Sequence, residues 1–472
     1  MTTFDETDAC YLPATQLVEL YQWKTLSPVE VVKDVLARIE AVNGAVNAVI
    51  RVDAEAALAA AKESEARWMK SEPKGLVDGV PVTIKDLLLT KGVVTGRGSK
   101  ATAGAKPAAD DAPAVARMRE HGAVFIGHTT TPELGWKGIT DSPLTGVTRN
   151  PWNTSKTPGG SSGGAATAAA LGMGALHIGT DGGGSVRIPA GFTGVFGLKP
   201  TAGRVPVHPA SAFGTLSHVG PITRTVEDAA LMMNVMIQPD SRDWYALAYD
   251  PWDYRTGLDL GVRRLRIAYS ADLGYVAVDP EIAEIVANAV KVFEEMGAHV
   301  EAADPGFEDP IDCFNKHWYR GCHNMISAYP KASHAEMDPG IREVAAIGAG
   351  YTLDEFNKAM DQRVQLGEVT NAFHTEYDLL LTPALPIAAF EAGREVPDPK
   401  PGARWTEWTP FSYPFNLTGQ PACVVPCGFT KAGLPVGLQI VGPRYADPLV
   451  MRAAGAFEIA RPFKMPRAAV AG

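Results

Sequence analysis

The chain has 472 residues, of which 46% are hydrophobic and 20% are charged, a balance typical of a globular protein with a large core. Its formal net charge of -10 argues against a general nucleic-acid binder and against a basic membrane-surface protein. The N-terminal MTTFDETDAC has no apolar core, unlike a signal peptide, and no segment has the roughly 20 apolar residues of a membrane span. We therefore expect a soluble, cytoplasmic protein with no nucleic-acid and no membrane partner.

The first part of the chain alternates helical and strand-like segments. Ser27, Pro28 and Glu30 form a capping box with proline at the first helical position, and Asn43-Gly44 is a typical helix stop. The expected helices span about 12–23, 28–42, 53–69 and 111–120, the expected strands about 46–52, 77–88 and 123–127, and residues 92–109 are expected to be irregular.

The second part continues the alternation. The expected helices span about 226–236, 280–296 and from 447 onward, residues 308–375 are expected to be mostly helical, and the expected strands span about 265–269, 299–302, 377–382, 424–428 and 436–441. The sequence shows no internal repeat and no clear linker. We predict one α/β domain over 1–472, with a mixed β-sheet core covered by helices on both faces.

The five cysteines do not indicate a disulfide framework, because their number is odd and their spacing is not paired. Cys423 and Cys427 are expected to be buried thiols. No CxxC or HxxxH pair supports a metal site near His317, Cys322 and His323.

Residues 157–189 stand apart from the rest. Two glycine-rich turns, 159–164 and 182–184, each present serines, and an apolar run of small residues, 165–178, lies between them. A flexible linker would consist of glycine and serine throughout. The stretch therefore indicates a functional site, and we expect the apolar run to be a packed helix.

Two common motifs fit the first turn poorly. A phosphate-binding loop needs lysine and Ser/Thr after its last glycine, but Ala165-Ala166 follow Gly164. Residues 160–164 match the G-x-S-x-G nucleophile elbow centred on Ser162, yet the residues before it form a loop instead of a strand.

The second turn has the composition of an oxyanion-binding site. Asp181 is followed by three glycines and Ser185, and backbone N–H groups in such a turn can bind an oxyanion that develops beside the serine. A serine nucleophile also needs a base, and no histidine accompanies either turn. Lys85, in its apolar strand, is the alternative, because burial favours the neutral amine; an ion pair of Lys85 with Asp86 is the competing interpretation.

Lys85, PGGSSGG at 158–164 and DGGGSVRIPA at 181–190 together resemble the amidase signature family. Further similar segments are 129–133, 148–153, 194–201, 203–204 and 416–421. The likeness covers most of the chain, with a core over about 75–220, and is weakest in a peripheral region over about 238–375.

The resemblance implies the amidase signature fold and a Ser-cis-Ser-Lys triad. Ser185 would be the nucleophile, Ser161 the bridging serine on a cis peptide, and Lys85 the final base. It implies an acyl-enzyme mechanism for which neither a metal nor an organic cofactor is needed.

Other residues would support this triad. The oxyanion donors would be backbone N–H groups of the second turn, and a buried ion pair would brace it. The N–H groups that would bind the oxyanion belong to Gly182, Gly183, Gly184 and Ser185. The supporting residues would be Asp181, Arg187 and Ser162.

Two positions depart from family patterns. Gly182 stands where the family often has threonine, and Ile188 stands where the glutamine-hydrolysing subunits of amidotransferases often have glutamine. We therefore expect a free-standing amidohydrolase acting on a small-molecule amide. The alternatives are the glutamine-hydrolysing component of an amidotransferase, a carbamate or aryl-amide hydrolase and, last, a non-catalytic binding protein. The sequence leaves open whether the protein forms a homodimer.

Aromatic residues are candidates for the wall of an acyl pocket. Trp136, Trp405, Trp408 and Phe411 are proposed to line it, with ordinary core packing as the alternative. Trp405 and Trp408 lie in a proline-rich loop, 391–410, of the kind that often covers a site.

Overall fold

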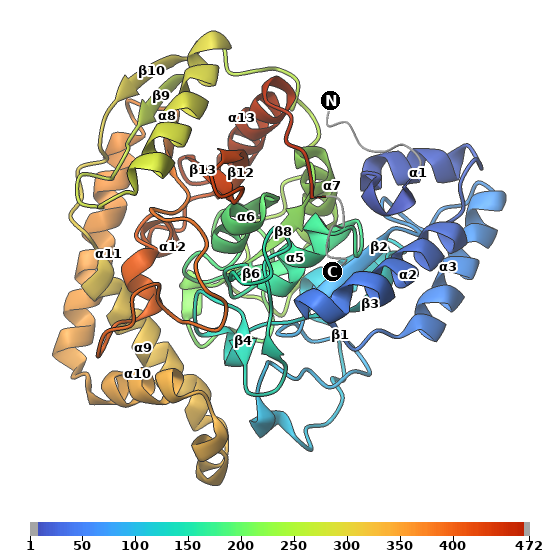
Figure 1. Ribbon diagram of the computed structural model, residues 1–472, viewed down its shortest axis with the longest axis horizontal. Helices are drawn as coiled ribbons and strands as arrows, with labels where there is room; N and C mark the ends of the chain where they lie inside the picture. The colour runs from blue at the N-terminus through green and yellow to red at the C-terminus, as the bar shows by residue number, and fades with distance from the viewer. Residues whose placement is uncertain (1–7, 467–472) are drawn as a thin grey trace.

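An eleven-stranded mixed β-sheet runs through the molecule in the order β1-β3-β2-β6-β8-β7-β12-β13-β11-β9-β10 (Figure 1). The structure, a computed structural model, describes residues 8–466. The strands are β1 Val49–Ile50, β2 Pro81–Lys85, β3 Val124–Thr129, β6 Leu176–Asp181, β7 Phe196–Lys199, β8 His218–Thr223, β9 Arg266–Tyr269, β10 His299–Ala302, β11 Leu379–Pro383, β12 Ala422–Phe429 and β13 Pro435–Val441. β4 (Asp141–Ser142) and β5 (Gly146–Val147) form a separate pair.

Parallel and antiparallel pairs alternate in blocks across the sheet. β3, β2 and β6 are parallel, as are β11, β9 and β10, whereas β8, β7, β12 and β13 pair in antiparallel fashion between them. The mixed sheet expected from the sequence is confirmed.

Helices cover both faces of this sheet. They are α1 Ala14–Gln22, α2 Pro28–Val46, α3 Ala54–Met69, α4 Pro113–Glu120, α5 Gly163–Ala170, α6 Arg187–Thr193, α7 Val226–Met236, α8 Pro280–Glu295, α9 Ile311–Ser327, α10 Pro339–Gly350, α11 Leu353–Phe373, α12 Pro414–Leu417 and α13 Asp447–Ala460. Side chains of β12 alternate between the faces: Val424 packs with the alanines of α5, while Cys423 and Val425 pack in the cluster that contains α7, α8 and α13. The small residues of α5 and α6 therefore allow both helices to lie close against the centre of the sheet.

The two ends of the molecule carry different helices (Figure 1). The blue N-terminal helices α1–α3 lie at one end, and α9, α10 and α11, in yellow and orange, lie at the other. α10 and α11 both pack on α9, and the three helices account for most of the peripheral region over 308–375.

Two expectations about local structure were wrong. The helix expected to end at Asn43 continues to Val46, and the following strand keeps only Val49–Ile50. Asn43 does not stop the helix, because its side chain binds beyond it, accepting hydrogen bonds from the N–H groups of Ala48 and Val49 at 2.9 and 2.8 Å. The left-handed cap is Asn47 instead.

The apolar run 165–178 is not one helix. α5 ends at Ala170, and β6 begins at Leu176. Gly172 and Gly174 between them have φ of 70° and 126°, which lets the chain reverse into the strand. Within residues 8–466, no helix is both long and apolar enough to span a bilayer.

Candidate active site

Lys85 is the last residue of β2, and its side chain is completely buried. The Nζ atom donates hydrogen bonds to Ser161 Oγ at 2.7 Å, Ser162 Oγ at 2.8 Å and Thr180 Oγ1 at 2.9 Å. All three acceptors are neutral hydroxyls. The competing ion pair with Asp86 does not form, because Asp86 pairs with Arg51 at 3.2 Å.

This environment favours an uncharged amine. Burial lowers the pKa of Lys85 well below its ordinary value, and the charge of Asp181 only partly opposes that effect. A neutral lysine amine in contact with a serine hydroxyl is able to accept its proton.

The first glycine-rich turn places two serines at this amine. The peptide bond between Gly160 and Ser161 is cis, as the resemblance implied. Ser161 lines a cavity, whereas Ser162 is fully buried and donates to the Thr180 carbonyl at 3.1 Å. The loop that precedes Ser162, in place of a strand, matches the expectation that argued against a nucleophile elbow.

The second turn joins the end of β6 directly to α6 and carries Ser185. Ser185 lines the same cavity as Ser161. The N–H groups of Gly182, Gly183 and Ser185 make no hydrogen bond to the described residues, so they are free to bind an oxyanion. Gly184 differs: its N–H donates to Asp181 Oδ1 at 2.8 Å, so this predicted oxyanion donor is already occupied.

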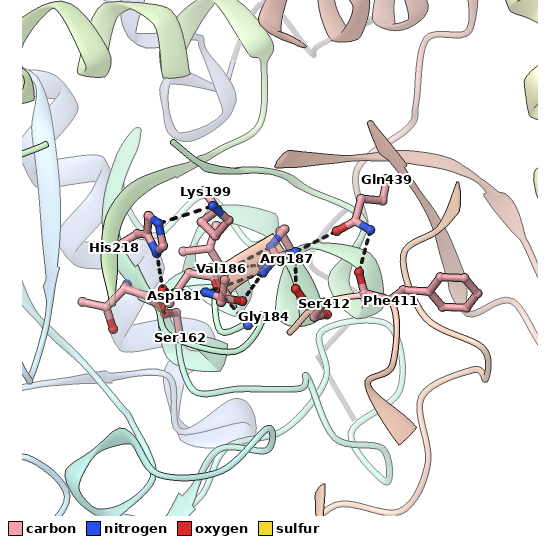
Figure 2. A network of polar contacts seen from close by, with 12 residues as sticks. Ser162, Asp181, Gly184, Val186, Arg187, Lys199, His218, Phe411, Ser412 and Gln439 are labelled. Atoms are coloured by element: carbon pink, nitrogen blue, oxygen red, sulfur yellow. Dashed lines mark hydrogen bonds and ion pairs between the residues drawn. The ribbon is translucent and has the colours of Figure 1, made fainter. Parts of the chain in front are cut away.

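A buried ion pair holds this turn in place (Figure 2). Arg187 Nε donates to Asp181 Oδ2 at 3.0 Å, and Nη1 donates to the Ser412 carbonyl and to Gln439 Oε1, both at 2.9 Å. Burial by itself would raise the Asp181 pKa, but the charge and hydrogen bonds of Arg187 outweigh it and hold the pKa well below its usual range. Asp181 therefore stays ionised and fixes the backbone around Ser185.

The cavity in front of the two serines has a volume of about 790 Å³. Its apolar wall includes Phe213 and Trp318, whose rings stack with centroids 3.7 Å apart. Leu87, Leu134, Met325 and Tyr329 also line it. This volume and lining suit an aromatic or branched organic group next to Ser185.

The four aromatic residues proposed for the pocket lie elsewhere. Trp136, Trp405, Trp408 and Phe411 are buried, and none of them is among the described residues that line the cavity. They pack behind the second turn or deeper in the core. A Cβ on Gly183 would lie 2.7 Å from both Phe314 Cζ and Trp405 Cη2, so Trp405 supports the turn from its back.

The same packing explains why Gly182 stands where the family often has threonine. A Cβ at this position would lie 2.9 Å from Trp318 Cζ3, closer than real Cβ contacts. Trp318 thus occupies the space that a threonine side chain would need.

Two polar residues were missed by the sequence reasoning. Thr180 is the third acceptor of Lys85, and only its position one residue before Asp181 could have pointed to it. Lys199 is buried behind the turn, 3.4 Å from His218 Nε2 (Figure 2), and burial together with the Arg187 charge lowers its pKa to about 7.

Comparison with known proteins places this geometry in a family. The amidase family model matches residues 30–451. The chain is 37% identical to an acylamidase of Rhodococcus erythropolis, with 96% of each chain covered, and 36% identical to one of the subunits of the glutamyl-tRNA(Gln) amidotransferase of Myxococcus xanthus, with 90% of this chain and 92% of that relative covered. The crystal structure of a bacterial aryl acylamidase of the amidase signature family superposes with a TM-score of 0.90 and 33% identity, covering 96% of this chain and 97% of that one.

The protein belongs to the amidase signature family. Its fold and its reaction class, hydrolysis of amides, are those of that family.

Proposed function

We propose that this protein is an amidohydrolase that cleaves the C–N bond of a small linear amide through an acyl-enzyme on Ser185. One observation carries the proposal: a buried lysine amine contacts the hydroxyl of Ser161, and Ser161 and Ser185 line one cavity. A base, a relay hydroxyl and a nucleophile at the cavity wall are thereby combined without a histidine.

The reaction then proceeds as a proton relay. Neutral Lys85 accepts the proton of Ser161 while Ser161 accepts that of Ser185, and Ser185 Oγ attacks the amide carbonyl. The oxyanion accepts hydrogen bonds from the N–H groups of Gly182, Gly183 and Ser185. The proton returns along the relay to the leaving amine, and water hydrolyses the acyl-enzyme by the same sequence.

The cavity favours an acylamidase that takes an aryl amide. The stacked Phe213 and Trp318 offer an apolar surface that suits a flat ring, and acylamidase and aryl acylamidase are among the similar proteins.

The glutamine-hydrolysing component of an amidotransferase is the second candidate, because the chain is also 36% identical to an amidotransferase polypeptide. At position 188, however, this chain has isoleucine, which is buried and would lie 2.8 Å from a Cβ on Gly184. The apolar part of the cavity wall, Phe213 and Trp318, likewise offers a flat ring more contact than it offers the side chain of glutamine.

A hydrolysis screen tests the proposal. Aryl, aliphatic and carbamate substrates, with glutamine, are incubated with the wild type and with Ser185→Ala. We expect turnover of an aryl amide above that of glutamine, and loss of turnover in a variant that keeps the wild-type circular dichroism. Glutamine as the best substrate, with a copurifying second polypeptide, would support the amidotransferase function instead.

A further inference from the structure

The charged side chains around the catalytic cavity are all of one sign. No Asp or Glu is among the described residues that line it, whereas Arg97 and Lys106 are. The chain as a whole carries a net charge of -10, so the formal charge of the cavity lining is opposite in sign to that of the chain. A ligand that enters meets only positive formal charge.

The guanidinium of Arg97 makes no ion pair or hydrogen bond within residues 8–466. The neighbouring carboxylate of Asp86 is already engaged, because it accepts from Arg51 Nη1 at 3.2 Å and from the N–H of Gly96 at 3.1 Å. The Arg97 guanidinium therefore has no direct carboxylate partner at the cavity wall, although the Asp86 carboxylate is close enough to feel its charge. Lys106 is exposed and better solvated.

The backbone holds Arg97 in a defined place. Its φ is 52°, in the left-handed region that non-glycine residues seldom adopt. Its N–H donates to the Asp86 carbonyl at 3.0 Å, and its carbonyl accepts from Leu134 N–H at 2.7 Å. Gly135 follows Leu134, and a Cβ on Gly135 would lie 3.6 Å from Ser161 Oγ. The backbone of Arg97 is therefore bonded to the segment of the cavity wall that lies beside the relay serine.

We propose that Arg97 is a specificity-determining residue that binds the carboxylate of an anionic amide substrate. The inference rests on the proposed function. A planar guanidinium binds a carboxylate through two parallel N–H···O bonds, and a partly buried site strengthens them. The carboxylate would lie at Arg97 while the apolar part of the substrate packs on Phe213 and Trp318.

Two nearly isosteric substrates test this assignment. 4-Acetamidobenzoate carries a carboxylate where 4'-nitroacetanilide carries a neutral nitro group. In Arg97→Gln, we expect kcat/KM for 4-acetamidobenzoate to fall roughly 10- to 100-fold, mainly through KM, because hydrogen bonds to a charged group are lost. The value for 4'-nitroacetanilide should stay within about twofold of wild type, since no charge is involved.

Two further variants serve as controls. Arg97→Lys should lose less than Arg97→Gln for the anionic substrate, because the charge remains and only the paired geometry is lost. Lys100→Gln removes a positive charge from an exposed residue of the same loop that does not line the cavity, and both substrates should keep their wild-type values. Equal losses for the two substrates in Arg97→Gln, or no loss, would overturn the proposal.

Binding to the Ser185→Ala protein separates this proposal from the proposed function. Calorimetry should show 4-acetamidobenzoate bound, and bound at least tenfold more weakly after Arg97→Gln is added. That result without any turnover by the wild type would reject the amidase function and retain the anion site. Absence of Arg97-dependent binding would reject the anion site even if neutral amides are hydrolysed.

Discussion

At the scale of single residues, Lys85 is unusual because its buried amine has no carboxylate partner. Its three hydrogen bonds go to Ser161, Ser162 and Thr180, all of them neutral. A charged ammonium would suffer a large desolvation cost here, so the neutral amine is the stable form. The residue is suited to accept a proton and unsuited to a structural ion pair.

The pH dependence of the rate follows from this lowered pKa. Lys85 acts as a base only when it is neutral, so kcat/KM should fall on the acid side as the pH drops through its folded-state pKa. In Lys85→Met the rate should fall about 10²- to 10⁴-fold, and the residual activity should lose this acid limb. A pH–rate profile measures both effects. An unchanged acid limb in the variant would assign the titration to another group.

At the scale of elements, the turn between β6 and α6 is packed from behind by aromatic rings. Phe314 and Trp405 lie where a Cβ on Gly183 would project. The turn is thereby pressed into one conformation, with the free N–H groups of Gly182 and Gly183 beside Ser185. The glycines serve close approach as well as chain reversal.

Gly183→Ala should therefore impair catalysis as well as packing. The added methyl group forces the rings or the turn to move, and we expect a loss of about 1–3 kcal/mol in the free energy of unfolding with a fall in kcat that exceeds any rise in KM. Gly367→Ala, in α11 and with no atom within 4 Å of the new Cβ, is the matched control and should be slightly stabilising. Wild-type kcat in Gly183→Ala would show that the turn tolerates the shift.

The sequence predicted where individual helices and strands lie along the chain better than it predicted which segments lie next to each other in space. N-cap side chains and prolines located the starts of α2, α7 and α8 closely, because these signals are local. Asn43 was wrongly expected to end α2. Its side chain accepts hydrogen bonds from the N–H groups of Ala48 and Val49, which lie beyond the end of the helix, and no local pattern indicates those bonds. The two turns were recognised by their composition and Lys85 as a candidate base, and the resemblance then joined them into one site. The aromatic wall was missed, because Phe213 and Trp318 come from segments far apart in the chain that no local pattern joins.

At the scale of the whole molecule, distant segments meet behind the active site. Arg187 contacts Ser412 and Gln439, and Lys199 donates to the Gln420 carbonyl. Thr201 Oγ1 donates to Asp447 Oδ2 at 2.6 Å, which ties the centre of the chain to α13. The site therefore forms only when the central and C-terminal parts of the sheet have assembled.

Lys199 makes stability depend on pH. Its folded pKa is lowered to about 7, by burial first and then by Arg187. Between about pH 7 and the ordinary lysine pKa the unfolded chain holds the additional proton, so the free energy of unfolding should rise with pH, by up to about 1.4 kcal/mol per unit. Urea unfolding from pH 7 to 9 should show this rise in the wild type relative to Lys199→Met. If the free energy of unfolding changed with pH in the same way in the wild type and in Lys199→Met, Lys199 would stay charged in the folded protein.

The central claim is that Ser185 is the nucleophile. The most direct measurement is peptide mass spectrometry after inactivation with a serine-reactive phosphonate, at one equivalent of label. We predict the label on Ser185, with its rate of attachment lowered in Lys85→Met but little changed in a variant of the exposed Lys100. A label on Ser162 instead would contradict the account, because it would make the first glycine-rich turn the nucleophile elbow and leave Ser185 without a chemical role.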